Sequence, residues 1–256
     1  MNLALTLITS FQSEWLKKKR SLASWMVIIG SVFTPAIMIL IQVLRTKSWP
    51  AKYLTPDFWE VYFKNCWEAM AILLLPMGII LSISLIAQLE YKNNTWKQLH
   101  ATPQPLTTIF ISKFAVILLM QLQLFVMFNV AIYLSAIIAS TLVESIPFPT
   151  EPFPLAYFAR QSGYYFIDSL PILAIQYLLG LHFRNFLVSV GAGLVLMVTG
   201  ITMISWEYSY IFPYNYMILH HVNKLPAVNI HAWAMGWFSL VMIASYILYL
   251  TKREKG

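Results

Sequence analysis

Residues that could do chemistry are sparse in this sequence, and most of them stand alone. Three histidines, His220, His221 and His231, lie close together and invite comparison with a metal site. Zinc sites combine histidine with cysteine or carboxylate ligands at short, recognisable spacings. No cysteine or carboxylate stands at such a spacing from these histidines. The sequence therefore predicts no bound metal.

Two carboxylates, Glu68 and Asp168, fall within apolar runs. A carboxylate inside a membrane is costly and is a functional hypothesis by default. Asp168 is expected either to face a translocation path and attract a cationic substrate, or to pair with a neighbouring Tyr, Asn or Lys and fix the packing. Glu68 is expected at the outer interface, one helical turn after Lys64. The two carboxylates differ in depth and no Ser-His motif accompanies them, so no catalytic residues are predicted.

The elements that position these residues are membrane helices. Of the 256 residues, 59% are hydrophobic and only 11% are charged, whereas soluble domains carry about 25% charged residues. The apolar runs are continuous and reach about 20 residues or more, which indicates spanning helices rather than barrel strands. We expect a single all-α transmembrane domain over residues 1–256. Its six predicted spans are residues 22–44, 66–89, 106–140, 157–181, 186–205 and 232–250.

The charge distribution indicates how the chain is oriented. Six spans place both termini on one side of the membrane. Most of the lysine and arginine residues fall on that side, which predicts cytoplasmic termini in a multi-pass protein of a bacterial cytoplasmic membrane. The net charge of +7 thus follows membrane topology, and no nucleic-acid partner is expected. The basic residues on the other side are Arg45, Lys47, Lys52, Lys64, Arg160 and Lys224.

Residues 1–20 precede the first span and form an amphipathic pattern. Ala4, Ile8, Phe11 and Trp15 step by four, three and four and share one helical face, whereas Thr6 falls on the opposite, polar face. A basic end follows. This pattern predicts a helix lying at the inner membrane boundary, in contact with lipid, or alternatively a simple topological anchor.

The cytoplasmic segment 90–105 separates the second and third spans. Glu90 to His100 can form about three helical turns, and Pro103 and Pro105 end them. Trp96 and Leu99 would share one side. Such a short polar helix could dock in a groove on a soluble partner, or it could be a solvated turn with Trp96 anchored at the headgroups.

The order of residues in these two segments resembles the type-2 family of ATP-binding-cassette (ABC) exporter permeases. Within it, the chain looks most like the lantibiotic-immunity and bacitracin-type permeases. A weaker match is "FPYNY", residues 212–216, in the last external link. The matching positions are Glu90, Thr95, Trp96, Lys97, Leu99, Pro103 and Lys113 in one segment, and Glu14, Trp15, Lys17, Lys19, Arg20 and Ser21 in the other.

This resemblance implies a division of labour with another protein. The segment from Glu90 to His100 would be a coupling helix, seated in a cleft of a separate ABC ATPase. The sequence holds no G-x-x-x-x-G-K-[ST] phosphate loop, so ATP and Mg are expected on that partner and no cofactor on this chain. A second permease chain, identical or different, would complete the transporter. The expected coupling residues are Glu90, Thr95, Trp96, Lys97, Leu99 and His100; those of the interfacial helix are Phe11, Glu14, Trp15, Lys17 and Arg20.

By resemblance, the external link 206–231 roofs the pathway, which makes Tyr214 and Tyr216 pathway candidates beside Asp168 and Glu68. The family also implies that the fifth span, with its three glycines, lines the contact between permease chains. In the third span, polar side chains are expected to bridge helices rather than bind substrate. The glycines are Gly191, Gly193 and Gly200, and the bridging residues are Gln121, Gln123 and Asn129.

The sequence thus predicts the permease subunit of an ATP-driven exporter. An aromatic, mostly apolar pathway suits an amphipathic substrate such as a lantibiotic, another antimicrobial peptide or a drug. The alternatives are a different cargo, lipid or polysaccharide, and an ATPase-independent secondary transporter. Secondary transporters usually show inverted repeats, and none is visible here. Neither a paired catalytic set nor a filter-like loop supports an intramembrane enzyme or an ion channel.

Overall fold

The computed structural model describes residues 3–19, 21–45, 49–92, 105–223 and 228–251. Every regular element in these ranges is a helix, which confirms the all-α class. The elements are α1 (Leu3–Lys18), α2 (Leu22–Leu44), α3 (Pro50–Tyr53), α4 (Phe58–Ala69), η1 (Met70–Leu74), α5 (Leu75–Lys92), α7 (Leu106–Leu142), α8 (Leu155–His182), α9 (Phe186–Met203), η2 (Ser209–Ile211), α10 (Tyr216–His221) and α11 (Ile230–Thr251).

Six helical segments are long and apolar enough to cross a membrane. The first, α2, has the predicted bounds. The second is longer than predicted, because it begins at Phe58 rather than at residue 66. Hydropathy alone missed the added turns of α4, where Glu60 and Lys64 interrupt an otherwise aromatic sequence. Their side chains are exposed, whereas Phe58, Trp59, Tyr62, Phe63, Cys66 and Trp67 are buried.

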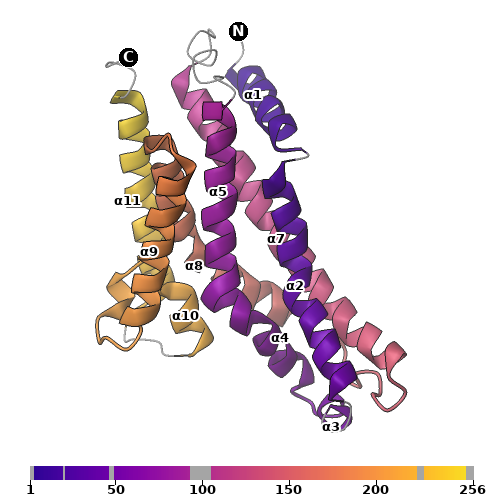
Figure 1. Ribbon diagram of the computed structural model, residues 1–256. Coiled ribbons are helices and arrows are strands. Elements are labelled where there is room, and N and C mark those ends of the chain that lie inside the picture. Colours follow the sequence, from indigo (N-terminus) through magenta and orange to yellow (C-terminus); the bar gives the residue numbers. More distant parts are fainter. Residues whose placement is uncertain (1–2, 20, 46–48, 93–104, 224–227, 252–256) are drawn as a thin grey trace.

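The second span contains a local change of helical pitch. A π-helical turn, Met70–Leu74, joins α4 to α5. Pro76 follows it, and a proline ring clashes with the carbonyl four residues earlier while lacking an N–H of its own. One wider turn relieves that conflict. Figure 1 shows α4 leaning away from the axis of α5 at this point.

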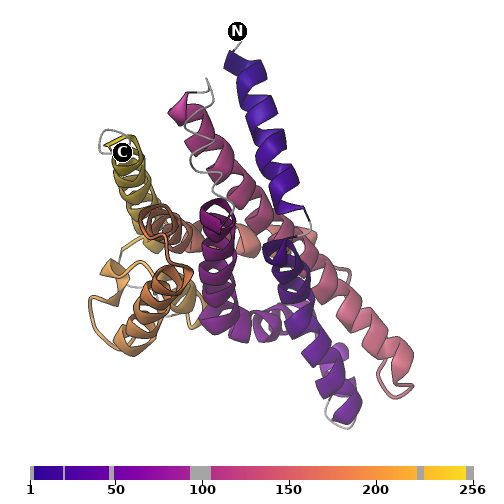
Figure 2. The ribbon, with the colours of Figure 1, turned by 45° about the horizontal axis from the view of Figure 1, so that its top comes forward.

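The helices pack as two groups that meet in the middle of the molecule. In one group α7 lies along α1 and α2, and in the other α8 lies along α11; α5 contacts both α2 and α8 (Figures 1 and 2). Both chain termini lie at one end, which we call the proximal end. The opposite, distal end carries α3 and α10.

The distal half is held by aromatic packing. Trp67 of α4 is fully buried, and its ring stacks on that of Tyr165 of α8 with centroids 4.0 Å apart and planes 6° apart. Phe63 packs edge-on against Phe158 at 4.7 Å. Burying aromatic side chains of this size supplies much of the packing energy of a core. This cluster fixes the face of α8 that carries Asp168.

Small residues let α9 approach its neighbours closely. A Cβ added to Gly193 would lie 2.9 Å from a methyl carbon of Ile80 and against the side-chain oxygen of Gln176, whereas one added to Gly191 would meet open space. Gly200 approaches Asn215 and Tyr214 of the distal link. Two of the three glycines of the fifth span, Gly193 and Gly200, therefore serve packing within this chain.

We expect Gly193→Ala to destabilise the protein by about 1–3 kcal/mol, because the methyl group overpacks the contact of α9 with α5 and α8. Gly191→Ala is the matched control on the same helix. It should be neutral or stabilising by up to about 1 kcal/mol, since alanine favours the helix. Thermal unfolding of the two variants in detergent measures the difference, and equal midpoints would show that the close approach is relaxed at no cost.

Candidate functional site where α10 and α11 meet the middle of α8

Asp168 is the one fully buried carboxylate of the described residues, and two imidazoles contact it. Its Oδ1 lies 2.7 Å from Nδ1 of His231, and its Oδ2 lies 3.0 Å from Nδ1 of His220. The Asp168 side chain is 0% exposed, that of His220 is 14% exposed, and that of His231 is 26% exposed. A carboxylate taken from water needs both charge compensation and hydrogen bonds, and the two imidazoles are its polar neighbours here.

One face of α8 prepares this site. Gln161, Tyr164, Tyr165 and Asp168 are spaced by three, one and three residues, so they line one side of the helix over two turns. The Gln161 side-chain oxygen lies 3.1 Å from Nε2 of His220. The helix therefore presents one carboxylate, one amide and two aromatic rings to the segment that follows α9.

The two histidines are positioned by helix ends. His231 stands in the first turn of α11, where the Asn229 side-chain oxygen accepts hydrogen bonds from the backbone N–H groups of His231 and Ala232 at 3.1 and 3.2 Å. An asparagine at this position caps a helix. His220 lies near the end of α10. Asn223, just after this helix, has a φ of 53°. Asparagine tolerates this left-handed conformation better than most residues do.

Each imidazole also stacks on a tyrosine ring of α8. His220 lies on Tyr165 with centroids 4.4 Å apart and planes 13° apart, and His231 lies on Tyr164 at 4.5 Å and 10°. The Tyr165 ring also stacks on Trp67, so the site continues into the aromatic core. Stacking and hydrogen bonding together fix the orientation of both imidazoles.

His221, the neighbour of His220, serves a different contact. Its Nδ1 lies 3.1 Å from the Tyr165 hydroxyl. Burial lowers the pKa of His221 below its ordinary value, and the nearby Glu68 carboxylate opposes that shift. His221 is therefore a neutral hydrogen-bonding partner at pH 7 and stands outside the Asp168 cluster.

The described helices enclose a groove and a small cavity. A groove of about 720 Å³ runs between α7 and α8, lined by apolar side chains such as Phe125, Val126 and Phe166. Its polar residues, Asn129 and Ser162, are hydrogen-bonded to each other at 3.0 Å. The groove can therefore take an apolar or amphipathic molecule without leaving those two groups unpaired.

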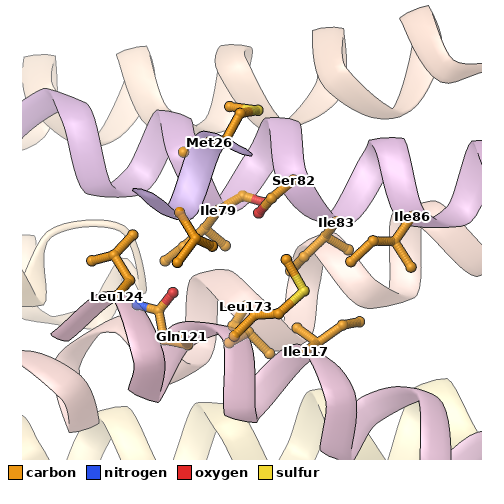
Figure 3. A pocket seen from close by; sticks show the side chains of 12 residues that line it. Met26, Ile79, Ser82, Ile83, Ile86, Ile117, Gln121, Leu124 and Leu173 are labelled. Carbon is orange, nitrogen blue, oxygen red and sulfur yellow. The ribbon is translucent and has the colours of Figure 1, made fainter. Parts of the chain in front are cut away.

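The second hollow is a small cavity of about 30 Å³ between α2, α5, α7 and α8 (Figure 3). Aliphatic side chains such as Ile79 and Ile117 line it. Its two polar side chains already have partners, since Ser82 bonds to the Ile79 carbonyl at 3.2 Å and Gln121 to Ser169 at 3.4 Å. This volume suits a water molecule and not a substrate.

Comparison with known proteins decides the family. The family described as "ABC-2 family transporter protein" matches residues 10–200, which cover α2 to α8 and nearly all of α9. The chain belongs to this family. No curated protein and no solved structure matches the chain. With its six apolar helices, this ABC-2 protein is a multi-pass membrane permease, and its family generally works with an ABC ATPase.

The pathway candidates of this ABC-2 permease differ in their burial. Glu68 is exposed on α4, whereas Tyr214 and Tyr216 are buried. Burial raises the pKa of both tyrosines well above the ordinary value. Asp168 pairs with histidines rather than with the Tyr, Asn or Lys that sequence reasoning expected. No carboxylate stands at a short spacing from the histidines in the sequence, yet the fold brings Asp168 to them over 52 and 63 residues of chain.

The first helix of the permease packs through polar residues. A stripe at intervals of four residues, Thr6, Ser10, Glu14 and Lys18, is its buried face. This stripe lies against α7, whereas Ile8 is 53% exposed. In a membrane protein, apolar side chains can face lipid while polar ones bind the neighbouring helix.

Charged contacts hold that stripe to α7. Glu14 lies 2.6 Å from the Lys17 ammonium and 3.5 Å from that of Lys113. The Lys18 ammonium donates a hydrogen bond to Gln123 at 3.1 Å and lies 4.1 Å from the centre of the Trp15 ring, which stacks with Phe11. Burial lowers the pKa of Lys18. Gln121, Gln123 and Asn129 thus all bridge helices, as predicted.

The predicted coupling residues lie largely outside the described residues. Only the backbone of Glu90 is described, in the last turns of α5. Arg20 of the predicted interfacial set is likewise outside. The outlying coupling residues are Thr95, Trp96, Lys97, Leu99 and His100.

We expect Asp168→Ala to lower the free energy of unfolding by about 3 kcal/mol, because it leaves two partly buried imidazoles without their shared acceptor. Glu68→Ala removes an exposed carboxylate from the neighbouring α4 and should change stability by no more than about 0.5 kcal/mol. Thermal denaturation in the same detergent compares the two variants. A loss no larger for Asp168→Ala than for Glu68→Ala would contradict a stabilising role for the cluster.

Proposed function

We propose that this ABC-2 permease is the transmembrane subunit of an ATP-driven exporter for amphipathic molecules. The family match over residues 10–200 carries the proposal, because it covers the second half of α1, the first four spans, most of the fifth, and the segment between the second and third. ABC-2 permeases generally act with an ABC ATPase, and residues 90–105 have the length and Trp-bearing pattern of a docking helix. ATP and Mg belong to that partner in our proposal.

The arrangement of the helix ends supports one orientation of the protein in the membrane. The start of α1, the end of α5 and the end of α11 lie at the proximal end, and basic residues stand in the sequence before α2 and directly after α11. Positive residues favour the cytoplasmic side. We infer a bacterial cytoplasmic membrane protein whose proximal end meets the ATPase and whose distal end, with α10, faces outward.

A second permease chain fits the exposed face of α9. Val188, Val195 and Val198 are 44%, 65% and 54% exposed and lie near the open space beside Gly191. The buried glycines, Gly193 and Gly200, face the chain's own helices. The apolar outer stripe is thus available to lipid or to an identical or different permease chain.

The groove between α7 and α8 supports an amphipathic cargo. Its lining is almost wholly apolar, with one internally paired Asn129–Ser162 contact. An antimicrobial peptide of the lantibiotic class, a drug or a lipid could place an apolar segment there. A polysaccharide would need many polar partners, which this lining does not offer, and we rank that cargo lower.

Trp96→Ala should uncouple the permease from its ATPase. When the tagged permease is purified from its native membrane, we expect ATP hydrolysis to co-purify with it, and the variant to lose about tenfold of that activity through loss of one buried aromatic contact. Trp206→Ala is the control, since Trp206 is a 48% exposed tryptophan beyond the distal end of α9. Undiminished ATPase recovery with Trp96→Ala would refute the docking role, and so would placement of Trp96 on the outer surface by labelling.

Filling the groove should impair cargo handling and leave folding intact. A Cβ added to Gly163 meets no atom within 4 Å, so Gly163→Phe can occupy the groove that it lines. We expect peptide-stimulated ATP hydrolysis to fall about tenfold while basal hydrolysis persists. Gly236→Phe on α11, another glycine with open space around it, controls for the added ring. Equal stimulation in both variants would exclude the groove from the cargo path.

A further inference from the structure

The contacts of His220 raise a question about charge. The Gln161 side-chain oxygen is an acceptor, so it binds the Nε2–H of His220 at 3.1 Å. In a neutral imidazole only one nitrogen carries hydrogen. The lone pair of Nδ1 then points at Oδ2 of Asp168, another lone-pair carrier, 3.0 Å away. Two such atoms repel each other in a buried site unless a proton or a metal ion stands between them.

A metal ion there would also serve His231. Its Nδ1 faces the second oxygen of the same carboxylate at 2.7 Å. The three ligand atoms, one from each of α8, α10 and α11, lie within 4.8 Å of one another. We propose that Asp168, His220 and His231 bind one divalent transition-metal ion of the zinc class.

The ligand set selects the class of metal. Imidazole nitrogens suit zinc and its neighbours, whereas magnesium and calcium take mainly oxygen ligands. Two histidines and one carboxylate are a known protein ligand set for zinc, and three protein ligands leave a position for water. The 14% and 26% exposed imidazoles give the ion access from the surface of this half of the molecule.

The surroundings have the form of an outer shell for such a site. Ligating histidines donate their other N–H to an acceptor, which fixes the tautomer and the ring orientation. Gln161 is that acceptor for His220, and Tyr165 and Tyr164 hold the two ring planes by stacking. All three residues lie on the same face of α8 as Asp168, so one helix supplies a ligand and its supports.

The bound ion would hold α10, a helix of six residues, and the start of α11 against α8. An ion that binds only the folded state stabilises it in proportion to the logarithm of its concentration. The stability of these contacts with α8 thus depends on the metal.

Metal binding can be measured on the whole permease, purified with a histidine-free tag and stripped with chelator. After zinc is added back, we expect one equivalent to remain bound through desalting. Co²⁺ added in its place should give the visible absorption of a low-symmetry nitrogen and oxygen site. Zinc at about 100 times its dissociation constant should raise the unfolding midpoint by about 5–10 °C, and Mg²⁺ should not.

Matched variants locate the ion. His220→Ala and His231→Ala should each weaken zinc binding at least tenfold, whereas His221→Ala, which removes the adjacent imidazole bound to Tyr165, should retain it. Substoichiometric zinc in the unaltered protein would overturn the proposal and leave a protonated histidine–carboxylate cluster. Equal losses in His220→Ala and His221→Ala would overturn it too. If the alanine variants fail to fold, the contrast between zinc and Mg²⁺ in the unaltered protein decides. Neither measurement needs transport or an ATPase, so its failure leaves the exporter proposal standing.

Discussion

The structure depends on one constraint, which is that polar side chains between membrane helices must find partners on other helices. Water is absent from the hydrocarbon layer, and an unpaired polar group there costs several kcal/mol. Asp168 is the strongest case, because it is ionisable and fully buried. Its pairing with His220 and His231 ties three helices together at one point. The direction of α10 and the start of α11 follow from that contact.

Neutral polar groups obey the same constraint elsewhere. Gln176 of α8 donates to Ser84 of α5 at 2.8 Å and to the Ser189 carbonyl of α9 at 3.0 Å. Near the distal end, Gln42 of α2 donates to Tyr62 of α4 at 2.8 Å. Each contact joins helices that hydrophobicity alone would let slide or rotate, because lipid is as apolar as the helix surfaces. These bonds therefore specify which faces meet.

The sequence predicted the helices but not which side chains of different helices contact one another. Continuous apolar runs predicted all six spans, and α2 has the expected ends. The start at Phe58 was missed because charges on the exposed face of α4 lower its mean hydropathy. The histidine–carboxylate cluster was missed for a different reason. Asp168 and His220 are 52 residues apart on helices whose relative rotation no spacing rule gives. The alternation of Ile8 with Thr6 did predict an amphipathic helix, but in a membrane either face can be the buried one.

The second span connects these local contacts to the end of α5. From Phe58 to Lys92 the backbone is helical throughout, with one π turn at Met70–Leu74. At one end it carries Trp67, which stacks on Tyr165 and through it adjoins His220. At its other end it leads into the segment that resembles a coupling helix. A helix transmits displacement along its axis because stretching it breaks hydrogen bonds at every turn. In the exporter that we propose, a shift imposed after Lys92 would meet the π turn before it reached Trp67, which adjoins the aromatic support of the Asp168 cluster.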